Sequence, residues 1–305
     1  MKATRTLIIA TGMILLGVGW WWVDNSQRVE SGRIQFAAPG PSEQGGEFSF
    51  DPYGAALHRY VNERGLVNYR GLKADNSQLD AFSASLASVS PAQYASWSEP
   101  RKIAFWINAY NALTLEAIIR NYPIRSSFLR SAVYPKNSIR QIPGVWDKLR
   151  FAVAGREMTL DEIEHATLRA KFNEPRIHVA LVCAALSCPP LRNEPYTGEK
   201  LDQQLDDQAR TFLASSQGLR IDRQAGEVHL SSIFKWFGED FVRTYGTREQ
   251  FAGKSDVERA VLNFVSRYVS DPDREFLVSS AYRIEYLDYD WTLNEQPAPQ
   301  SGRSE

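Results

Sequence analysis

The densest apolar pattern in the chain runs from Ile103 to Ile119, where apolar residues fill nearly every position instead of one face. A helix of this kind is buried on most of its sides, and Pro123 is expected to end it. At about 100° per residue, Asn108, Asn111 and Leu115 fall on one face. Two amides in a buried position need hydrogen-bond partners. We therefore expect them either to hold a neighbouring loop or to line a pocket.

A second apolar run extends from Ile177 to Cys183, with His178 as its one polar residue. Such a run predicts a central β-strand that is covered on both faces. Alternation along the strand would place Ile177 and Cys183 on one face and His178 on the other, so that Cys183 and His178 would not be neighbours. The strand would lead into a tight, proline-containing loop at 184–192.

The remaining patterns are shorter and switch between helix and strand periods. Helices are predicted at 53–64, 77–89, 159–170, 197–214 and 255–269, with a short aromatic turn at 233–238. Hairpins are predicted at 149–158 and 219–230, and a last strand at 283–291. Because the strands are scattered among the helices, we expect an α+β fold. It would be a single domain at 48–294, with the central helix buried against a small mixed or antiparallel sheet.

The helix predicted from Thr159 opens with a capping box and carries an apolar arc on one side. Glu164 lies inside that arc and His165 lies at its edge. A carboxylate on a buried face needs a cation, or else it stays protonated. The candidate partners are three arginines that follow in the chain, Arg169, Arg176 and Arg192. In the simpler interpretation the resulting ion pair would be structural.

The N-terminus predicts export from the cytoplasm. Lys2 and Arg5 precede an uncharged run at 6–23, which is at the short end of a membrane span, and the charges favour a cytoplasmic start. Three tryptophans at 20–22 stand where the far interface would lie, and no small-residue cleavage site follows. We therefore predict an uncleaved inner-membrane anchor at 1–24, a linker at 25–47, a periplasmic domain and a disordered tail at 295–305. A cleaved signal peptide is the alternative.

Composition removes several classes of partner. Lys and Arg number 35 and Asp and Glu number 36, and no block of like charge occurs, so nothing indicates nucleic-acid binding. Four His and two Cys, without a CxxC or HxxxH pair, give no basis for a zinc site. We expect neither a metal nor a cofactor.

The two cysteines allow three interpretations. In an oxidising compartment, Cys183 and Cys188 point first to a disulfide, which would close a small loop and contribute about 2 kcal/mol. A pair of buried thiols is the second possibility. The third is a reactive Cys188 beside His165 or His178, as in thiol nucleophiles. Ser187 lacks the Gly-x-Ser-x-Gly surroundings of a serine nucleophile.

Three segments together resemble a known family. They are Phe105-Trp106-Ile107-Asn108-Ala109-Tyr110-Asn111-Ala112, then Ile163-Glu164-His165 with Leu168-Arg169, and then Arg176-Ile177-His178 with the run from Cys183 to Leu191. They are similar to the "domain of unknown function 547" family over roughly residues 95–215. The resemblance implies export, because bacterial members are often exported, but it implies no particular chemistry.

A weaker likeness, at the level of the fold, is to papain-like and transglutaminase-like proteins. There a buried helix packs on a sheet whose strand carries the catalytic histidine, and the helix at 101–121 and His178 would take those places. The nucleophilic cysteine at the start of that helix is missing here. A likeness of folds alone is a weak basis for assigning an activity.

Three functions remain compatible with these patterns. The first is an envelope hydrolase or acyltransferase that acts on peptide or amide bonds. Its candidate catalytic residues are Cys188, His165, His178 and Glu164, and its candidate binding residues for a peptide or envelope polymer are Asn108, Tyr110, Asn111, Ser187 and Arg192. The second is a binding or scaffold domain without catalysis, and the third is a redox-sensitive cysteine pair. For all three we expect the loop at 186–192 to pack against the Asn108/Asn111 face and the helix that carries Glu164.

Overall fold

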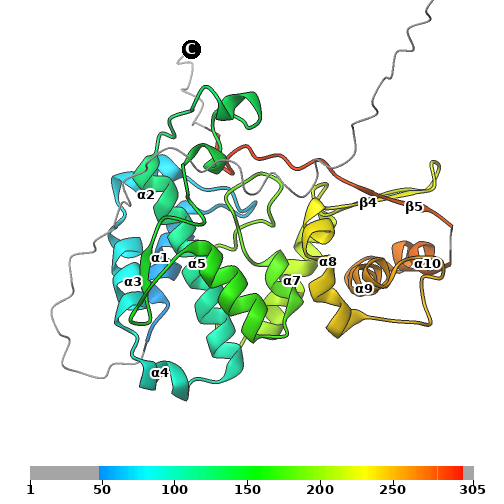
Figure 1. The fold of residues 1–305 in the computed structure, drawn as a ribbon, viewed down its shortest axis with the longest axis horizontal. Coiled ribbons are helices and arrows are strands. Elements are labelled where there is room, and N and C mark those ends of the chain that lie inside the picture. The colour runs from blue at the N-terminus through cyan, green and yellow to red at the C-terminus, as the bar shows by residue number, and fades with distance from the viewer. Residues whose placement is uncertain (1–47, 280, 298–305) are drawn as a thin grey trace, which may run out of the picture. The chain divides into compact units, whose positions relative to one another are not determined.

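The computed structural model describes residues 48–279 and 281–297 (Figure 1). The predicted anchor at 1–24 and linker at 25–47 lie outside the described residues. Within the described part, no helix combines the length and hydropathy that a membrane span requires. Residues 295–297, predicted to belong to a disordered tail, are placed: Gln296 donates a backbone hydrogen bond to the Val67 carbonyl. That part of the tail prediction was wrong.

Helices dominate the first half of the described chain. They are α1 (Asp51–Tyr60), α2 (Tyr69–Ala74), α3 (Ser77–Ser88), α4 (Pro91–Ser96) and α5 (Glu99–Asn121), followed by the 3-10 turns η1 (Arg130–Ala132) and η2 (Ile139–Gln141).

Short strands and further helices make up the rest. They are β1 (Phe151–Val153), β2 (Arg156–Met158), α6 (Leu160–Ile163), the π-helical turn η3 (Glu164–Arg169), the 3-10 helix η4 (Pro175–Val179), α7 (Leu201–Ala214), β3 (Leu219–Asp222), β4 (Glu227–Leu230), α8 (Ser232–Tyr245), α9 (Asp256–Ser266), α10 (Asp271–Ser279) and β5 (Arg283–Tyr286). Mixed helices and small sheets of this kind fit the predicted α+β class.

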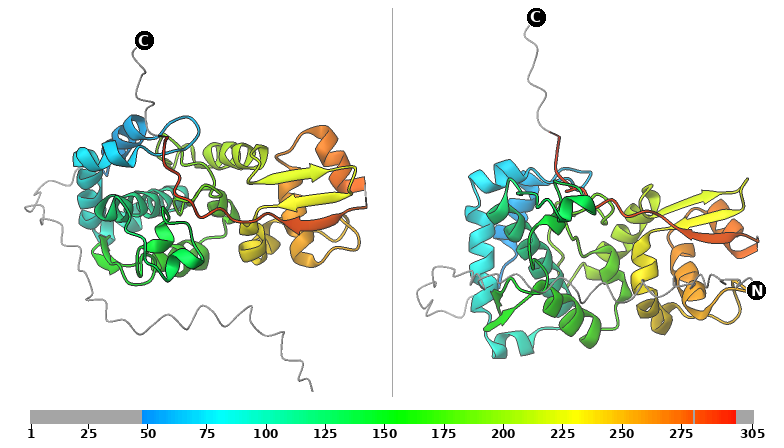
Figure 2. Two further views of the ribbon diagram at one scale, coloured as in Figure 1. Left: turned by 90° about the horizontal axis from the view of Figure 1, so that it is seen from above. Right: turned by 45° about the horizontal axis from the view of Figure 1, so that its top comes forward.

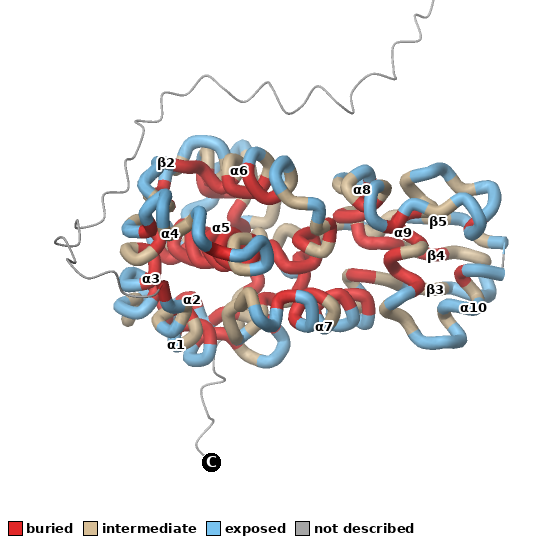
Figure 3. The backbone as a smooth tube through the Cα atoms, turned by 90° about the horizontal axis from the view of Figure 1, so that it is seen from below, coloured by how far each residue is buried: buried red, intermediate tan, exposed pale blue. Residues whose placement is uncertain are grey.

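Helix α5 is the centre of the larger hydrophobic core. Every residue from Ile103 to Ile119 is buried, as predicted, and Figure 3 shows the helix enclosed by other segments. Its main neighbours are α2, α3, α6, η3 and α7. The prediction that α5 packs on a sheet was therefore wrong. Helices and loops can cover a helix that is apolar on all sides as well as a sheet can, because the hydrophobic effect is not directional.

The two predicted hairpins are confirmed. Strands β1 and β2 pair antiparallel around Gly155, whose φ of 71° suits a glycine turn. Strands β3 and β4 pair antiparallel, and β5 joins β4 in parallel to give a three-stranded mixed sheet. The predicted last strand at 283–291 ends early, at Tyr286. The predicted aromatic turn at 233–238 is the first part of the longer helix α8.

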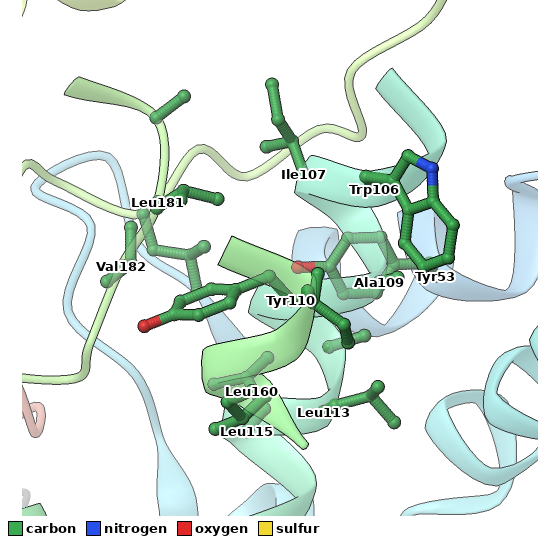
Figure 4. Close-up of a cluster of buried hydrophobic side chains, with 14 of the residues drawn as sticks. Tyr53, Trp106, Ile107, Ala109, Tyr110, Leu113, Leu115, Leu160, Leu181 and Val182 are labelled. Atoms are coloured by element: carbon green, nitrogen blue, oxygen red, sulfur yellow. The ribbon is translucent and has the colours of Figure 1, made fainter. Parts of the chain in front are cut away.

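The predicted central strand at Ile177–Cys183 is not formed. Residues Pro175–Val179 make the 3-10 helix η4, which packs on α7 and α8, and 180–182 continue as a buried loop that leads to Cys183. The apolar run reflected burial correctly, but a short apolar run does not by itself distinguish a strand from other buried segments. Figure 4 shows Leu181 and Val182 of this loop beside Tyr110 of α5.

Residues 287–297, named here the C-terminal strap, return from β5 across the chain (red in Figures 1 and 2). The strap forms backbone hydrogen bonds with the loop at 184–187: the Leu186 N–H donates to the Thr292 carbonyl, and the Asn294 N–H donates to the Ala184 carbonyl. Farther along, it pairs with Val67. The strap thus brings C-terminal side chains to the loop that holds both cysteines.

Candidate functional site

The loop between Cys183 and Cys188 is tight and held at both ends. Ala184 has a φ of 60°, in the left-handed region that non-glycine residues rarely adopt. A bridge between Ala185 and Leu293, and the hydrogen bond from Asn294 to Ala184, fix the loop in this conformation. Backbone strain that the surroundings maintain is typical of functional sites.

This turn brings two free thiols together. The sulfur atoms of Cys183 and Cys188 lie 2.6 Å apart, yet both residues are free cysteines, so the predicted disulfide is not formed in the structure. Cys188 is buried and Cys183 is partly exposed. The Cys183 N–H also donates to the Cys188 sulfur, over 3.2 Å.

Tyr289 of the C-terminal strap completes the thiol pair. Its hydroxyl oxygen lies 3.1 Å from the Cys188 sulfur and 3.3 Å from the Cys183 sulfur. Burial, followed by the neighbouring sulfurs, raises the pKa of Tyr289 well above its ordinary value. The phenol therefore stays protonated and can donate a hydrogen bond to a sulfur.

The two thiols are electrostatically unequal. Burial works to raise the pKa of Cys188, but hydrogen bonds from the Cys183 thiol, the Tyr289 hydroxyl and the backbone outweigh burial and lower it. The hydrogen bond to Cys188, then burial, raises the pKa of Cys183 well above its ordinary value. The pair can hold one negative charge with one remaining proton between the sulfurs.

Two asparagines of α5 hold the chain on either side of the thiols. Asn111 donates to the Ala180 carbonyl over 3.0 Å and accepts from the Val182 N–H over 2.9 Å. Asn108 makes the same two-bond contact with Tyr196, at 2.7 Å to its carbonyl and 3.0 Å from its N–H. Of the two predicted roles, the structure gives both amides that of holding loops.

Ser187 and Arg192, predicted as binding residues, have local partners. The Ser187 hydroxyl donates to Gln217 over 2.6 Å and accepts from the Asp290 N–H over 2.8 Å. The Arg192 guanidinium donates to Asp207 and to Glu194, over 2.5 and 2.6 Å. Arg192 is therefore engaged away from Glu164, and the hydrogen bonds of the two asparagines go to residues 180, 182 and 196.

Glu164 starts the π-helical turn that follows α6. It is buried, as the apolar arc predicted, with Tyr110 of α5 as a hydrogen-bonding neighbour. Burial raises the pKa of Glu164 to about 7, although Tyr110 and then Arg169 draw it down. Turns of π-helix often occur at functional sites. A carboxyl group that titrates near neutral pH can both donate and accept a proton.

Arg169, the nearest of the predicted partners of Glu164, is paired elsewhere. It donates to both oxygens of Asp240 on α8, over 2.6 and 3.0 Å. No ion pair among the described residues joins Glu164 to an arginine, and the predicted pair was wrong in this respect. Arg176 is likewise engaged with Glu174, Asp202 and Asp206.

His165 and His178, the two histidines predicted as catalytic, both belong to the network around Asp240. His178 Nε2 lies 2.7 Å from Asp240 Oδ2, and Arg169 Nη1 lies 3.1 Å from His165 Nδ1. Burial lowers the pKa of each histidine, and Asp240 only partly counteracts it. Burial also works to raise the pKa of Asp240, but hydrogen bonds from His178 and Arg169 lower it strongly.

These shifts assign the protons in the network. An ionised Asp240 can only accept, so neutral His178 donates from Nε2. Arginine can only donate, so His165 accepts at Nδ1 and carries its proton on Nε2. That N–H lies 3.9 Å from Asp161, and its ring is partly exposed. His165 is thus a neutral imidazole at the edge of the site, whereas His178 is sealed inside.

Three important residues escaped the sequence patterns. Asp240 lies on α8 beyond the end of the predicted turn at 233–238. Phe237 lies within that turn, and it stacks on His178 with ring centroids 4.3 Å apart. Tyr289 was assigned to a strand. The polar residues of the 233–245 stretch, extended at helical spacing, could have indicated Asp240, but no local signal connects Tyr289 with cysteines about a hundred residues away.

The structure gives Cys188 no histidine partner. Its side-chain hydrogen bonds to other side chains, among the described residues, are with Cys183 and Tyr289, while His178 faces Asp240 and Phe237. The charge of Glu164 works to raise the pKa of Cys183 and of Tyr110. Within the described residues, no group of three or more His, Cys, Asp and Glu side chains could hold a metal ion.

Residues 94–213 match the family described as "Protein of unknown function, DUF547". This confirms the family resemblance over a range that includes α5, the π-helical turn and both cysteines. Asp240 and Tyr289 lie outside it. No curated protein and no solved structure matches the chain. The likeness to papain-like and transglutaminase-like folds finds no support, since His178 lies on a 3-10 helix and not on a sheet strand.

Proposed function

We propose that Cys183 and Cys188 form a redox-active dithiol that exchanges with disulfides of small thiols or of other proteins. The observation that carries the proposal is the pair of free sulfurs, 2.6 Å apart, that share the Tyr289 hydroxyl. A thiolate is the reactive species in such exchange, and hydrogen bonds to sulfur favour it at neutral pH. The pair has one thiol with a lowered pKa and one that stays protonated.

The exchange would proceed in two steps. Cys183 is the partly exposed residue of the pair, so we assign to it the attack on an incoming disulfide RS–SR. The proton of the pair passes to Cys188, and the Cys183 thiolate attacks one sulfur of RS–SR, which forms a mixed disulfide and expels RS⁻. Cys188 then loses its proton, attacks the Cys183 sulfur and expels the second RS⁻. Two electrons pass from the dithiol to RS–SR, which leaves as two thiols after taking up two protons.

The surroundings of the pair favour this chemistry over acyl transfer by a cysteine. A thiol nucleophile in acyl transfer is paired with a base, most often histidine. Cys188 faces a second thiol and a tyrosine instead. With the predicted N-terminal anchor, the dithiol would lie in the periplasm, where disulfides are the prevailing partners of free thiols.

The test is a titration of the full-length chain in glutathione buffers of increasing oxidised fraction. Free thiols are then blocked with a maleimide and counted by mass. The chain contains two cysteines, so the count is unambiguous. We expect both thiols to disappear together, without an adduct. Thiols that persist through the whole series would refute the proposal.

Two single variants test the order of attack. Cys188→Ser should accumulate a stable mixed disulfide at Cys183, because the resolving thiol is missing. Cys183→Ser should react slowly, because the remaining sulfur is buried. The opposite pattern, with the adduct on Cys188, would contradict the assigned roles.

A second candidate function, hydrolysis of a peptide or amide bond, rests on a different observation. The buried Glu164 carboxyl has a pKa of about 7, and one of its oxygens lies 4.0 Å from Nδ1 of the partly exposed His165. A carboxyl group tuned to neutral pH is suited to general acid and base catalysis. In this case Glu164→Gln and His165→Ala should each abolish hydrolysis of a peptide library, while blocking both thiols should not. Activity that survives Glu164→Gln would exclude this candidate.

A further inference from the structure

The segment between α5 and β1 exposes apolar side chains to an unusual degree. Phe128 is 93% exposed, Leu129 is 79% exposed and Val133 is 64% exposed. All three lie on or beside the 3-10 turn η1. Single exposed apolar residues are ordinary on protein surfaces, but several on one turn mark a site of interaction.

The outward orientation of these side chains is built into the segment. Gln141 is buried and holds the inner side: its amide donates to the carbonyls of Tyr134 and Pro135, and its oxygen accepts from the Ser127 N–H. Arg130 also donates to the Arg140 carbonyl. Because the polar groups of the segment are satisfied inward, the apolar side chains on the turn are left facing solvent.

The segment is also uniformly basic. Residues 124–146 contain Arg125, Arg130, Lys136 and Arg140 but no Asp or Glu, in a chain whose net charge is -1. Arg125 and Lys136 are exposed, and neither forms an ion pair among the described residues. The Arg140 guanidinium lies over three aromatic rings, those of Tyr134, Trp146 and Trp291, and so it packs within the segment.

The carboxylate of Glu295, on the C-terminal strap, forms its hydrogen bonds to this segment with neutral groups. It accepts hydrogen bonds from the Tyr122 hydroxyl and from the Asn137 amide. The exposed cations at 125 and 136 precede and follow the apolar turn in the chain, and no carboxylate of the described residues pairs with either.

We propose that this turn docks on the surface of an anionic lipid bilayer. Phe128, Leu129 and Val133 would enter the boundary between headgroups and acyl chains, while Arg125 and Lys136 would meet lipid phosphates. Apolar side chains flanked by cations are the combination that binds such surfaces, and each cation near the surface adds to the attraction. The contact would be independent of the thiol chemistry and of the predicted N-terminal anchor.

The size of the apolar cluster favours a lipid surface over a protein partner. A stable protein interface buries about 800 Å² on each side, over some 20 residues or more. Three side chains on one turn fall well short of that area. A bilayer requires less, because a few inserted side chains and adjacent cations bind a surface that is itself continuous.

The test measures amide hydrogen exchange in residues 124–134 of the full-length chain, with phosphatidylcholine vesicles that contain or lack phosphatidylglycerol. We expect exchange to slow severalfold only when the anionic lipid is present, and the effect to fall with added salt. Equal exchange in both vesicle types would overturn the proposal. So would protection that follows protein concentration without lipid, since that would indicate a second copy of the chain as the occupant.

Three variants complete the experiment. The triple change Phe128→Ser, Leu129→Ser and Val133→Ser should abolish the protection, and Arg125→Glu with Lys136→Glu should remove its dependence on anionic lipid. Val278→Ser, at another exposed apolar position, is the matched control and should leave the protection intact. Unchanged exchange in α5 confirms that each variant is folded. Protection that persists in the triple variant would refute the assignment.

Discussion

Arg169 donates two hydrogen bonds to Asp240, and no arginine among the described residues forms an ion pair with Glu164. The acid that lies five positions before the arginine in the chain is thus not its partner, whereas a residue from α8 is. A buried carboxylate without a paired cation is costly, and the neutral acid becomes the favoured form. Burial thus raises the pKa of Glu164 to about 7, and Tyr110 and Arg169 lower it only in part.

The first prediction concerns Glu164→Gln. A glutamate in the unfolded chain has a pKa of about 4.3, so the raised value destabilises the folded state as pH increases, by roughly 3 kcal/mol once pH exceeds 7. The neutral amide removes this penalty but keeps an oxygen for the Tyr110 hydroxyl. The variant should therefore melt above the wild type at pH 8 and near it at pH 5.

The sign of this effect separates two accounts of Glu164. If the residue were paired with arginine, Glu164→Gln would lower the melting temperature at pH 8 instead. Glu157→Gln on β2 serves as the control, because Glu157 is exposed and its replacement should leave the pH dependence of melting unchanged. Calorimetry of the three proteins between pH 5 and pH 8 distinguishes the outcomes.

The second prediction concerns Asp240→Asn. The amide cannot accept from both Arg169 and His178 as a carboxylate does, so the free energy of unfolding at pH 7 should fall by about 2 kcal/mol. Because the pKa of Asp240 is lowered on folding, the stabilisation is present above the unfolded pKa of about 3.9 and fades as pH drops below it. The loss should therefore shrink below pH 4.

Nitrogen-15 NMR of the histidine rings gives a second readout for this variant. In the wild type, His178 should carry its proton on Nε2 at pH 7, since that nitrogen faces the ionised Asp240. Asp240→Asn should broaden or shift that signal, whereas His58, exposed on α1, should be unaffected. A proton on Nδ1 of His178 in the wild type would contradict the assigned network.

The parts of the fold that sequence predicted are those with strong local signals. The all-apolar run of α5 predicted a buried helix, and Thr159 with Glu162 predicted a capping box. Gly155 and Gly226 indicated the turns of two hairpins. The run at 177–183 was predicted to be buried but was given the wrong element. Two backbone groups of this run form hydrogen bonds with the side chain of Asn111. Local periodicity in the sequence cannot indicate a hydrogen-bond partner that lies on another helix.

The candidate site was predictable only in part for a similar reason. Cys183 and Cys188 are close in the chain, so their meeting followed from one tight turn. Tyr289 and Asp240 reach the site through the C-terminal strap and α8, which are long-range features of the fold. The expected pairing of Glu164 with Arg169 is not formed, because Arg169 pairs with Asp240. Asp240 contacts Arg169 in space but is distant from it in the sequence.

The third prediction concerns Asn111→Ala. Removing the amide leaves the Ala180 carbonyl and the Val182 N–H without partners in a buried loop. Each orphaned group costs about 1–3 kcal/mol, so unfolding in urea should require about 2–5 kcal/mol less free energy. Asn173→Ala, at an exposed position, should change stability by less than about 0.5 kcal/mol. Equal stability of the two variants would show that the loop is held by other contacts.

The fourth prediction concerns the N-terminus, which lies outside the described residues. The apolar run at 6–23 ends in three tryptophans without a cleavage site, so the expressed chain should keep its first residues and remain in the inner-membrane fraction. Mass spectrometry of the purified protein decides the matter. A mature N-terminus between residues 20 and 40 would show that the segment is a cleaved signal peptide.

The last prediction concerns Tyr289→Phe, which removes one hydroxyl and leaves the ring in place. That hydroxyl lies within hydrogen-bonding distance of both sulfurs, and its single proton, directed to Cys188, helps to lower the pKa of that thiol. A hydrogen bond to a charged group is worth about 1.5–3 kcal/mol, so its loss should raise the pKa of the thiol pair by about one unit or more. Alkylation by iodoacetamide at pH 7 should slow about tenfold, and the rate should recover at higher pH. Tyr286→Phe on β5 is the control and should react like the wild type, because the sulfurs bond to the strap and not to β5. An unchanged rate in Tyr289→Phe would mean that the tyrosine does not activate the thiols, and the proposed redox pair would lose its main electrostatic support.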